Sequence, residues 1–145
     1  MPADSGIEDP GWRPAGSGGA HSADGASGMG IALQILDSTY GQAAADIPAR
    51  LERACAGGWA LVGAAATGST GRIAQLCEEP QDRGLYRLSI DSGSYFASLG
   101  VSSAYPEIII VFRAEDESST CQITVQLSPY SFSANFVTMA QLGSG

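Results

Sequence analysis

One stretch near the C-terminal end of the chain carries the residues best suited to hold a small molecule. Between Cys121 and Phe136, Thr, Gln, Ser and Asn alternate with apolar residues, in the period of two that is typical of β-strands. One face of such strands is expected to enter the core, while the other is polar, uncharged and able to form hydrogen bonds. That face suits a ligand wall better than a surface in bulk water, where Lys and Glu are expected. By this alternation the wall contains Thr124, Gln126, Ser133 and Asn135.

The chain offers few groups for proton transfer or covalent catalysis. It has no Lys, which excludes a Schiff-base lysine, and its only histidine, His21, lies in a polar N-terminal segment. The three cysteines form no C-x-x-C pair, and we expect reduced, mostly buried thiols. Cys121 alternates opposite to Gln122, so we assign it to the core and not to a nucleophile. The sequence predicts no metal site and no cofactor.

Short runs of β type, separated by turn signals, begin at Gly30 and extend to the wall segment. About eight such strands at this spacing predict an all-β fold, an antiparallel two-sheet sandwich. The wall segment supplies two of them, joined by a tight corner at Leu127–Tyr130. The others are expected at Ile31–Asp37, Ile47–Ala54, Trp59–Val62, Arg72–Cys77, Leu85–Ile90 and Glu107–Phe112.

One short helix is expected after the strand that ends at Ile90. Asp91 can cap it by accepting hydrogen bonds from the free N–H groups of the first turn, and Gly100 is a natural residue to follow its end. Tyr95 and Phe96 fall at helical spacing in between. The acidic run of residues 115–117 fits a hairpin loop, where consecutive carboxylates are usually solvated.

Length and charge limit the class of protein. With 145 residues, the chain is predicted to form one domain at residues 29–140, after a disordered Gly-, Ser- and Ala-rich tail at 1–28 and before a flexible C-terminus at 141–145. The formal charge of −8 argues against nucleic acid and anionic membranes as partners. No apolar run approaches the ~20 residues of a membrane span, and the first residues lack the pattern of a signal peptide. We therefore expect a cytoplasmic protein.

Four stretches of this sequence also match the pattern of a known family. They are Ile35–Asp37 with Gly41, Thr70–Arg72, Gly84–Asp91 leading into Ser94–Phe96, and Leu127–Tyr130. In order and spacing the chain resembles the transthyretin and 5-hydroxyisourate hydrolase family over roughly residues 31–138. The resemblance implies two four-stranded sheets, a helix after the fifth strand, and a homotetramer built as a dimer of dimers. Its ligand channels would lie between dimers and be lined by the first, seventh and eighth strands.

The residues expected for hydrolase chemistry differ here. The family's hydrolases are known for a histidine in the first strand, an arginine in the Gly-Arg turn, a histidine in the seventh strand and a terminal Tyr-Arg-Gly-Ser. The arginine is present as Arg72, but Gln34 and Gln122 stand at the two histidine positions, and Asn135–Thr138 replaces the tetrapeptide. Glutamine cannot usefully take or give a proton at neutral pH, although it can hold carbonyl or amide groups.

These residues favour a family member repurposed within bacterial specialised metabolism. It would act on a cyclic or polyfunctional small molecule by cyclisation, ring opening or hydrolysis. Arg72 would stabilise developing negative charge, while Gln34, Gln122 and Asn135 would orient the ligand and Leu36 would line the site. Asp37 could serve as an acid or base, but a turn or capping role is favoured. The alternatives are a non-catalytic ligand-binding protein of transthyretin type and a 5-hydroxyisourate hydrolase of purine degradation.

Overall fold

The computed structural model describes residues 28–115, 117 and 119–140. The predicted tail, apart from Gly28, and the predicted C-terminal segment at 141–145 lie outside the described residues, and so does His21. The elements follow the chain in the order β1 (Gly30–Asp37), β2 (Gln42–Ala43), β3 (Pro48–Cys55), β4 (Gly58–Ala66), β5 (Arg72–Ile73), β6 (Gly84–Ile90), α4 (Ser92–Ser98), β7 (Ile108–Ala114), β8 (Ser119–Ser128) and β9 (Ser131–Ala140).

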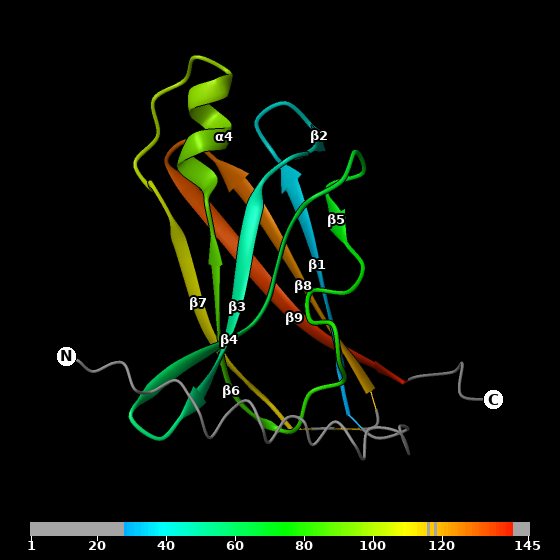
Figure 1. Ribbon diagram of the computed structural model, residues 1–145. Coiled ribbons are helices and arrows are strands. Elements are labelled where there is room, and N and C mark those ends of the chain that lie inside the picture. The colour runs from blue at the N-terminus through cyan, green and yellow to red at the C-terminus, as the bar shows by residue number, and fades with distance from the viewer. Residues whose placement is uncertain (1–27, 116, 118, 141–145) are drawn as a thin grey trace.

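Two sheets pack face to face, with α4 at one end of the sandwich (Figure 1). One sheet has the order β2-β1-β8-β9, with β5 also paired to β1, and the other has the order β4-β3-β6-β7. All neighbours are antiparallel except β1 and β8, which run parallel. The mostly β sandwich with one short helix is therefore confirmed. No helix within the described part of the chain is long and apolar enough to cross a membrane.

The core lies between the sheets and is built largely from alternate residues of the central strands. In β1 the side chains of Ile31, Leu33 and Ile35 are fully buried. In β8 every second residue from Cys121 to Leu127 is buried, and the residues between them are half-buried or exposed. Burying each of the large aliphatic side chains stabilises the fold by roughly 1.5–3 kcal/mol, which fixes the register and so decides which residues face outward.

The predicted helix is confirmed as α4. The Asp91 carboxylate accepts a hydrogen bond from the backbone N–H of Ser94 at 3.2 Å, which caps the first turn. Phe96 is buried and belongs to the core. Gly100 has a φ of +75°, the left-handed conformation that ends many helices.

Two expectations about connections are wrong. The strand expected at Arg72–Cys77 is only the two-residue β5, after which the chain leaves the sheet edge and places Cys77 in the core. The acidic run that begins at Glu115 is not a hairpin loop, because β7 pairs with β6 whereas β8 pairs with β1. It is a crossover between the two sheets. Strand alternation is the same for a hairpin and for a crossover, so the sequence pattern does not separate them.

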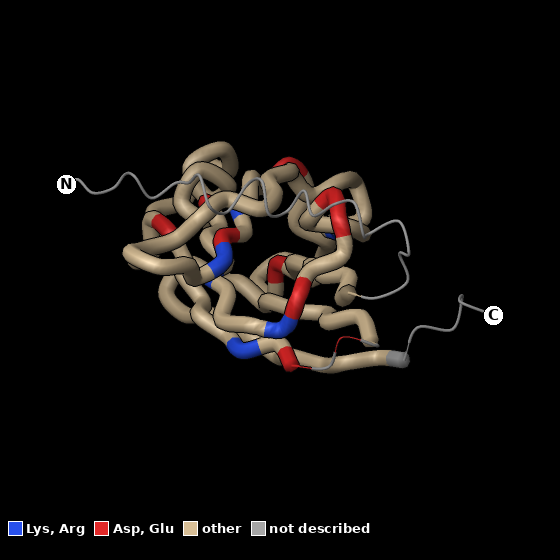
Figure 2. Tube along the Cα trace, turned by 60° about the horizontal axis from the view of Figure 1, so that its bottom comes forward, with Lys and Arg blue, Asp and Glu red and all other residues tan. Residues whose placement is uncertain are grey.

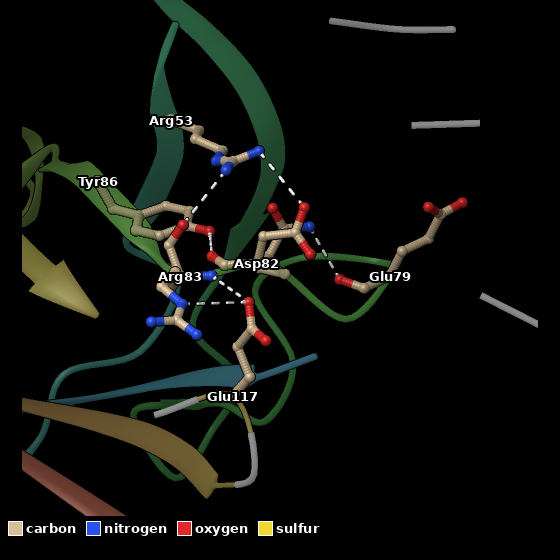
Figure 3. A network of polar contacts seen from close by, with 7 residues as sticks. Arg53, Glu79, Asp82, Arg83, Tyr86 and Glu117 are labelled. Carbon is tan, nitrogen blue, oxygen red and sulfur yellow. Dashed lines mark hydrogen bonds and ion pairs between the residues drawn. The ribbon is translucent and has the colours of Figure 1, made fainter. Parts of the chain in front are cut away.

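Charged side chains gather where this crossover meets the segment before β6. Figure 3 shows Arg53, Asp82, Arg83 and Glu117 around Tyr86. Arg53 donates from Nη2 to the backbone oxygen of Arg83 at 3.3 Å, and the backbone N–H of Arg83 donates to Glu117 Oε2 at 2.8 Å. The Tyr86 hydroxyl donates to the backbone oxygen of Asp82. Because β6 separates this cluster from α4, it lies at the end of the sandwich opposite the helix.

In contrast to this cluster, the sheet that contains β1 has few charged residues. From Ser119 to Ala140, which covers β8 and β9, the chain has no Asp, Glu, Lys or Arg. Figure 2 shows the same contrast as long tan stretches between a few charged positions. Strands β8 and β9 therefore contribute no charged side chain to this sheet.

Candidate functional site

The polar face predicted for β8 is present and extends across neighbouring strands. Gln122, Thr124 and Gln126 alternate with buried residues and point away from the core. Residues that lie directly opposite each other in a ladder share a face of the sheet. Thr124 is paired with Asn135 of β9 and Gln126 with Ser133, so both β9 residues join the same face.

Strand β1 continues these rows on the other side of β8. Gln34 is in register with Thr124, and Leu36 with Gln126. Gln34 is also paired with Arg72 of β5, which brings the arginine onto the same face. The eight site residues predicted from the sequence therefore lie together on one outward face, called the polar face below. They are Gln34, Leu36, Arg72, Gln122, Thr124, Gln126, Ser133 and Asn135.

Two exposed hydrogen bonds connect the residues around Arg72, and the one made by Arg72 itself is long. Arg72 donates from Nη1 to Oε1 of Gln122 at 3.5 Å. Gln34 donates from Nε2 to the backbone oxygen of Thr70 at 2.9 Å. Gln34 is thus bonded to the loop before β5, and Gln122 is bonded to the arginine of β5.

Asp37 and Tyr95 lie next to the polar face but belong to the structure that supports it. The Asp37 side chain is fully buried. Its Oδ1 accepts from the backbone N–H groups of Thr39 at 2.9 Å and Tyr40 at 3.1 Å, and its Oδ2 accepts from the Tyr95 hydroxyl at 2.7 Å. Burial, and then this bond to Asp37, raise the pKa of Tyr95. The turn role favoured from the sequence is confirmed for Asp37.

The cysteines also have the structural role that was expected. None of the three forms a disulfide, and Cys77 and Cys121 are buried. The Cys121 sulfur lies 3.9 Å from the sulfur of Met29, inside the core. Burial raises the pKa of the Cys77 thiol to about 11, so this thiol is not a nucleophile at neutral pH. Within residues 28–115, 117 and 119–140, no three His, Cys, Asp or Glu come together to form a metal site.

The sequence prediction did not include other contributors to this face, among them Met139, which is exposed and paired with Thr120. Val137 is paired with Gln122 and adds an exposed apolar side chain. Its alternation with Asn135 was the signal that could have revealed it. The backbone oxygen of Thr70 holds Gln34, and a main-chain acceptor leaves no mark in the sequence.

The strand β9 differs from the expectation that its second face lies in the core. Phe132 and Phe136 point toward the other sheet but remain exposed in part. Phe136 contacts Phe112 of β7, with ring centroids 5.4 Å apart, and Phe132 contacts Tyr105 at 5.2 Å. These rings lie at the open edge of the sandwich, because β9 is the last strand of its sheet.

The sandwich, its helix after β6 and the outward polar face of β1, β8 and β9 define a transthyretin-like protein. The chain belongs to the HIUase/Transthyretin family, whose model matches residues 31–135. The transthyretin of Aquarana catesbeiana is 30% identical over 129 residues, which cover 83% of this chain and 84% of that protein.

Solved structures agree with this assignment. Sea bream transthyretin in complex with thyroxine is 25% identical and has a TM-score of 0.71, over 77% of this chain and 98% of that one. The 5-hydroxyisourate hydrolase of Klebsiella pneumoniae shares the fold, with a TM-score of 0.67 and 24% identity over 74% of this chain and 98% of that one. The family resemblance stated from the sequence is therefore confirmed.

Proposed function

We propose that the polar face binds a small polyfunctional molecule through a carboxylate or another oxyanion, with Arg72 as the group that recognises the anion. One observation carries this proposal: Arg72 is the only charged residue among the eight members of the polar face, and its guanidinium contacts the Gln122 side chain of that face. A cation among uncharged hydrogen-bonding side chains pairs with an anionic ligand by charge-assisted hydrogen bonds. The thyroxine complex of the sea bream relative supports a small-molecule ligand for this chain.

Binding is favoured over catalysis, because Asp37 and Cys121, which could act as acid, base or nucleophile, are buried away from the polar face. Asp37 is buried and saturated by hydrogen bonds, and Cys121 is in the core. The polar face itself offers amides, hydroxyls and a guanidinium, which orient and stabilise but do not accept protons near neutral pH. A binding protein needs nothing more.

A repurposed enzyme is the second candidate, and the Arg72–Gln122 contact favours it. That contact uses one of the five N–H donors of the guanidinium, and the others can stabilise an oxyanion that develops during cyclisation, ring opening or hydrolysis. Gln34, Gln122 and Asn135 would orient the ligand, and catalysis would depend on positioning and electrostatics. Hydrolysis of 5-hydroxyisourate is less favoured, because Gln34 and Gln122 do not exchange protons.

We further propose that the polar faces of two dimers meet in a homotetramer, so that each face becomes one wall of a ligand channel. The outward direction of the polar face and the family membership support this arrangement. Two walls would enclose the ligand and exclude water, which strengthens the pairing of an anion with Arg72.

The anion site can be tested with benzoate as the probe and neutral benzamide as its uncharged counterpart. We expect benzoate to shift the NMR signals of the Arg72 side chain and of β1 and β8, and Arg72→Gln to weaken its binding about tenfold. Arg113→Gln is the matched control, because Arg113 is an exposed arginine of the other sheet. Equal binding by Arg72→Gln and wild type would refute the proposal.

Two assays separate the candidate functions. A ligand captured from a cell extract and recovered unchanged supports binding, whereas its conversion by wild type but not by Arg72→Ala supports the enzyme. The decay of fresh 5-hydroxyisourate with and without the protein tests the hydrolase directly.

A further inference from the structure

The two glutamines of the polar face use opposite ends of their side-chain amides to bond their partners: Gln34 uses its NH₂ and Gln122 uses its oxygen. The partner of Gln34 is the backbone oxygen of Thr70, an acceptor, so the NH₂ of the Gln34 side chain must point to it. The partner of Gln122 is the Arg72 guanidinium, which can only donate, so the amide oxygen of Gln122 must point to it. Both orientations follow from the chemistry of the partners.

The atoms left for a ligand are therefore different at the two positions. The bond to Thr70 uses one N–H of the Gln34 side chain, and the oxygen Oε1 remains as an acceptor for a ligand. Gln122 presents its NH₂, a donor, beside the remaining N–H groups of Arg72. Although both residues are glutamines, Gln34 thus offers a ligand an acceptor and Gln122 offers it a donor.

The register of β1 and β8 places this acceptor and this donor next to each other. Gln34 is in register with Thr124, and Gln122 precedes Thr124 by two positions on the same face of β8. Gln34 and Gln122 are therefore diagonal neighbours on adjacent strands, within reach of one small molecule. Arg72, paired across β5 and β1 with Gln34, borders both.

We propose that the polar face selects a ring-bearing carboxylate that also carries an N–H or O–H donor. The carboxylate would accept from Arg72 and from the Gln122 NH₂, and the donor would bond to Gln34 Oε1. This inference rests on the proposed function and adds the specificity of the same site. A ligand without the donor leaves the Gln34 oxygen covered and unpaired, which lowers its affinity.

Three aryl carboxylates test the pattern in a titration followed by NMR. They are benzoate, 3-hydroxybenzoate, which adds a donor, and 3-methoxybenzoate, which offers an acceptor at the same place. We expect wild type to bind 3-hydroxybenzoate about tenfold more tightly than 3-methoxybenzoate. Because this preference is measured on the unaltered protein, it does not depend on whether any variant folds.

Gln34→Met then identifies the residue that causes the preference, because Met keeps the length of the side chain and removes the acceptor. The ratio of the two affinities should fall to about one. Gln81→Met is the matched control, since Gln81 also donates from Nε2 to a backbone oxygen at 2.9 Å and lies away from the polar face. It should keep the wild-type ratio.

The outcomes separate this inference from the proposed function. If none of the three carboxylates shifts the signals of the polar face, the anion site itself is refuted, and the donor pattern with it. If benzoate binds at Arg72 but wild type does not distinguish the hydroxy from the methoxy compound, the anion site stands and the donor pattern is refuted. A preference that survives in Gln34→Met also refutes it.

Discussion

Tyr95 of α4 donates a hydrogen bond from its hydroxyl to Oδ2 of Asp37, the last residue of β1, at 2.7 Å. Gln42 of β2 donates to the same hydroxyl at 3.3 Å. The helix between β6 and β7 of the other sheet is thereby tied to the end of the strand that carries Gln34 and Leu36. This contact positions one end of the polar face although it is not part of it.

Tyr95→Phe should destabilise the protein, because it leaves one oxygen of a buried carboxylate without its partner. We expect the free energy of unfolding to fall by about 1–3 kcal/mol, measured by urea denaturation at neutral pH. Tyr40→Phe is the control, since Tyr40 is 56% exposed. A loss of the same size in both variants would show that the bond to Asp37 contributes nothing specific.

The free energy of unfolding should fall at alkaline pH, because the buried Cys77 thiol has a raised pKa. Burial raises the pKa of Cys77 from 9.0 to about 11. The unfolded chain therefore releases this proton at lower pH than the folded one, so stability is complete below pH 9 and is lost as the pH rises toward about 11. The full loss from this group is about 3 kcal/mol.

Urea denaturation at several pH values between 8 and 11 checks this dependence. Cys77→Ala should lose stability less steeply with rising pH than wild type, whatever its stability at pH 8. Cys55→Ala, which removes a half-exposed thiol, should keep the wild-type slope. Parallel slopes for wild type and Cys77→Ala would contradict the assignment of this effect to Cys77.

The loop that presents Arg72 requires glycine at one position. Gly71 has a φ of +76°, and a Cβ there would collide with the backbone oxygen of Ile35. Gly71→Ala should therefore cost more than the 1–2 kcal/mol of a left-handed conformation alone, and it should displace Arg72. Gly68→Ala in the same loop is the control, because its Cβ would meet only the Arg72 backbone oxygen at 3.8 Å. Similar urea midpoints for the two variants would contradict this account.

The parts of the site that the sequence predicted by itself are those governed by strand alternation. A period of two separates Gln122 and Thr124 from the buried residues of β8, whatever the rest of the fold does. The meeting of Gln34 with Arg72 is different, because these residues are far apart in the chain and are joined by the pairing of β1 with β5. Only the family resemblance placed them together.

Features that depend on the backbone or on topology were not predictable in this way. The Thr70 oxygen that orients Gln34 is a main-chain atom, so any residue type could have supplied it. The crossover that begins at Glu115 has the composition of a hairpin loop, and only the pairing of its two strands with different sheets shows what it is. Local sequence determines which side of a strand is buried, whereas long-range pairing determines which strand lies beside it.

The edge strand β9 should join a second copy of the chain. Among the described residues it is the last strand of its sheet, so one row of its backbone groups pairs with no other described strand, and it exposes Phe132, Phe136 and Val137. We expect wild type to sediment as an oligomer, with the tetramer as the largest species, and Val137→Lys to dissociate it by placing a charge on this strand. Leu61→Lys is the control, since Leu61 of β4 is 51% exposed and Val137 is 50% exposed. Sedimentation of wild type as a monomer at micromolar concentration, or equal dissociation by both variants, would show that β9 is not the interface.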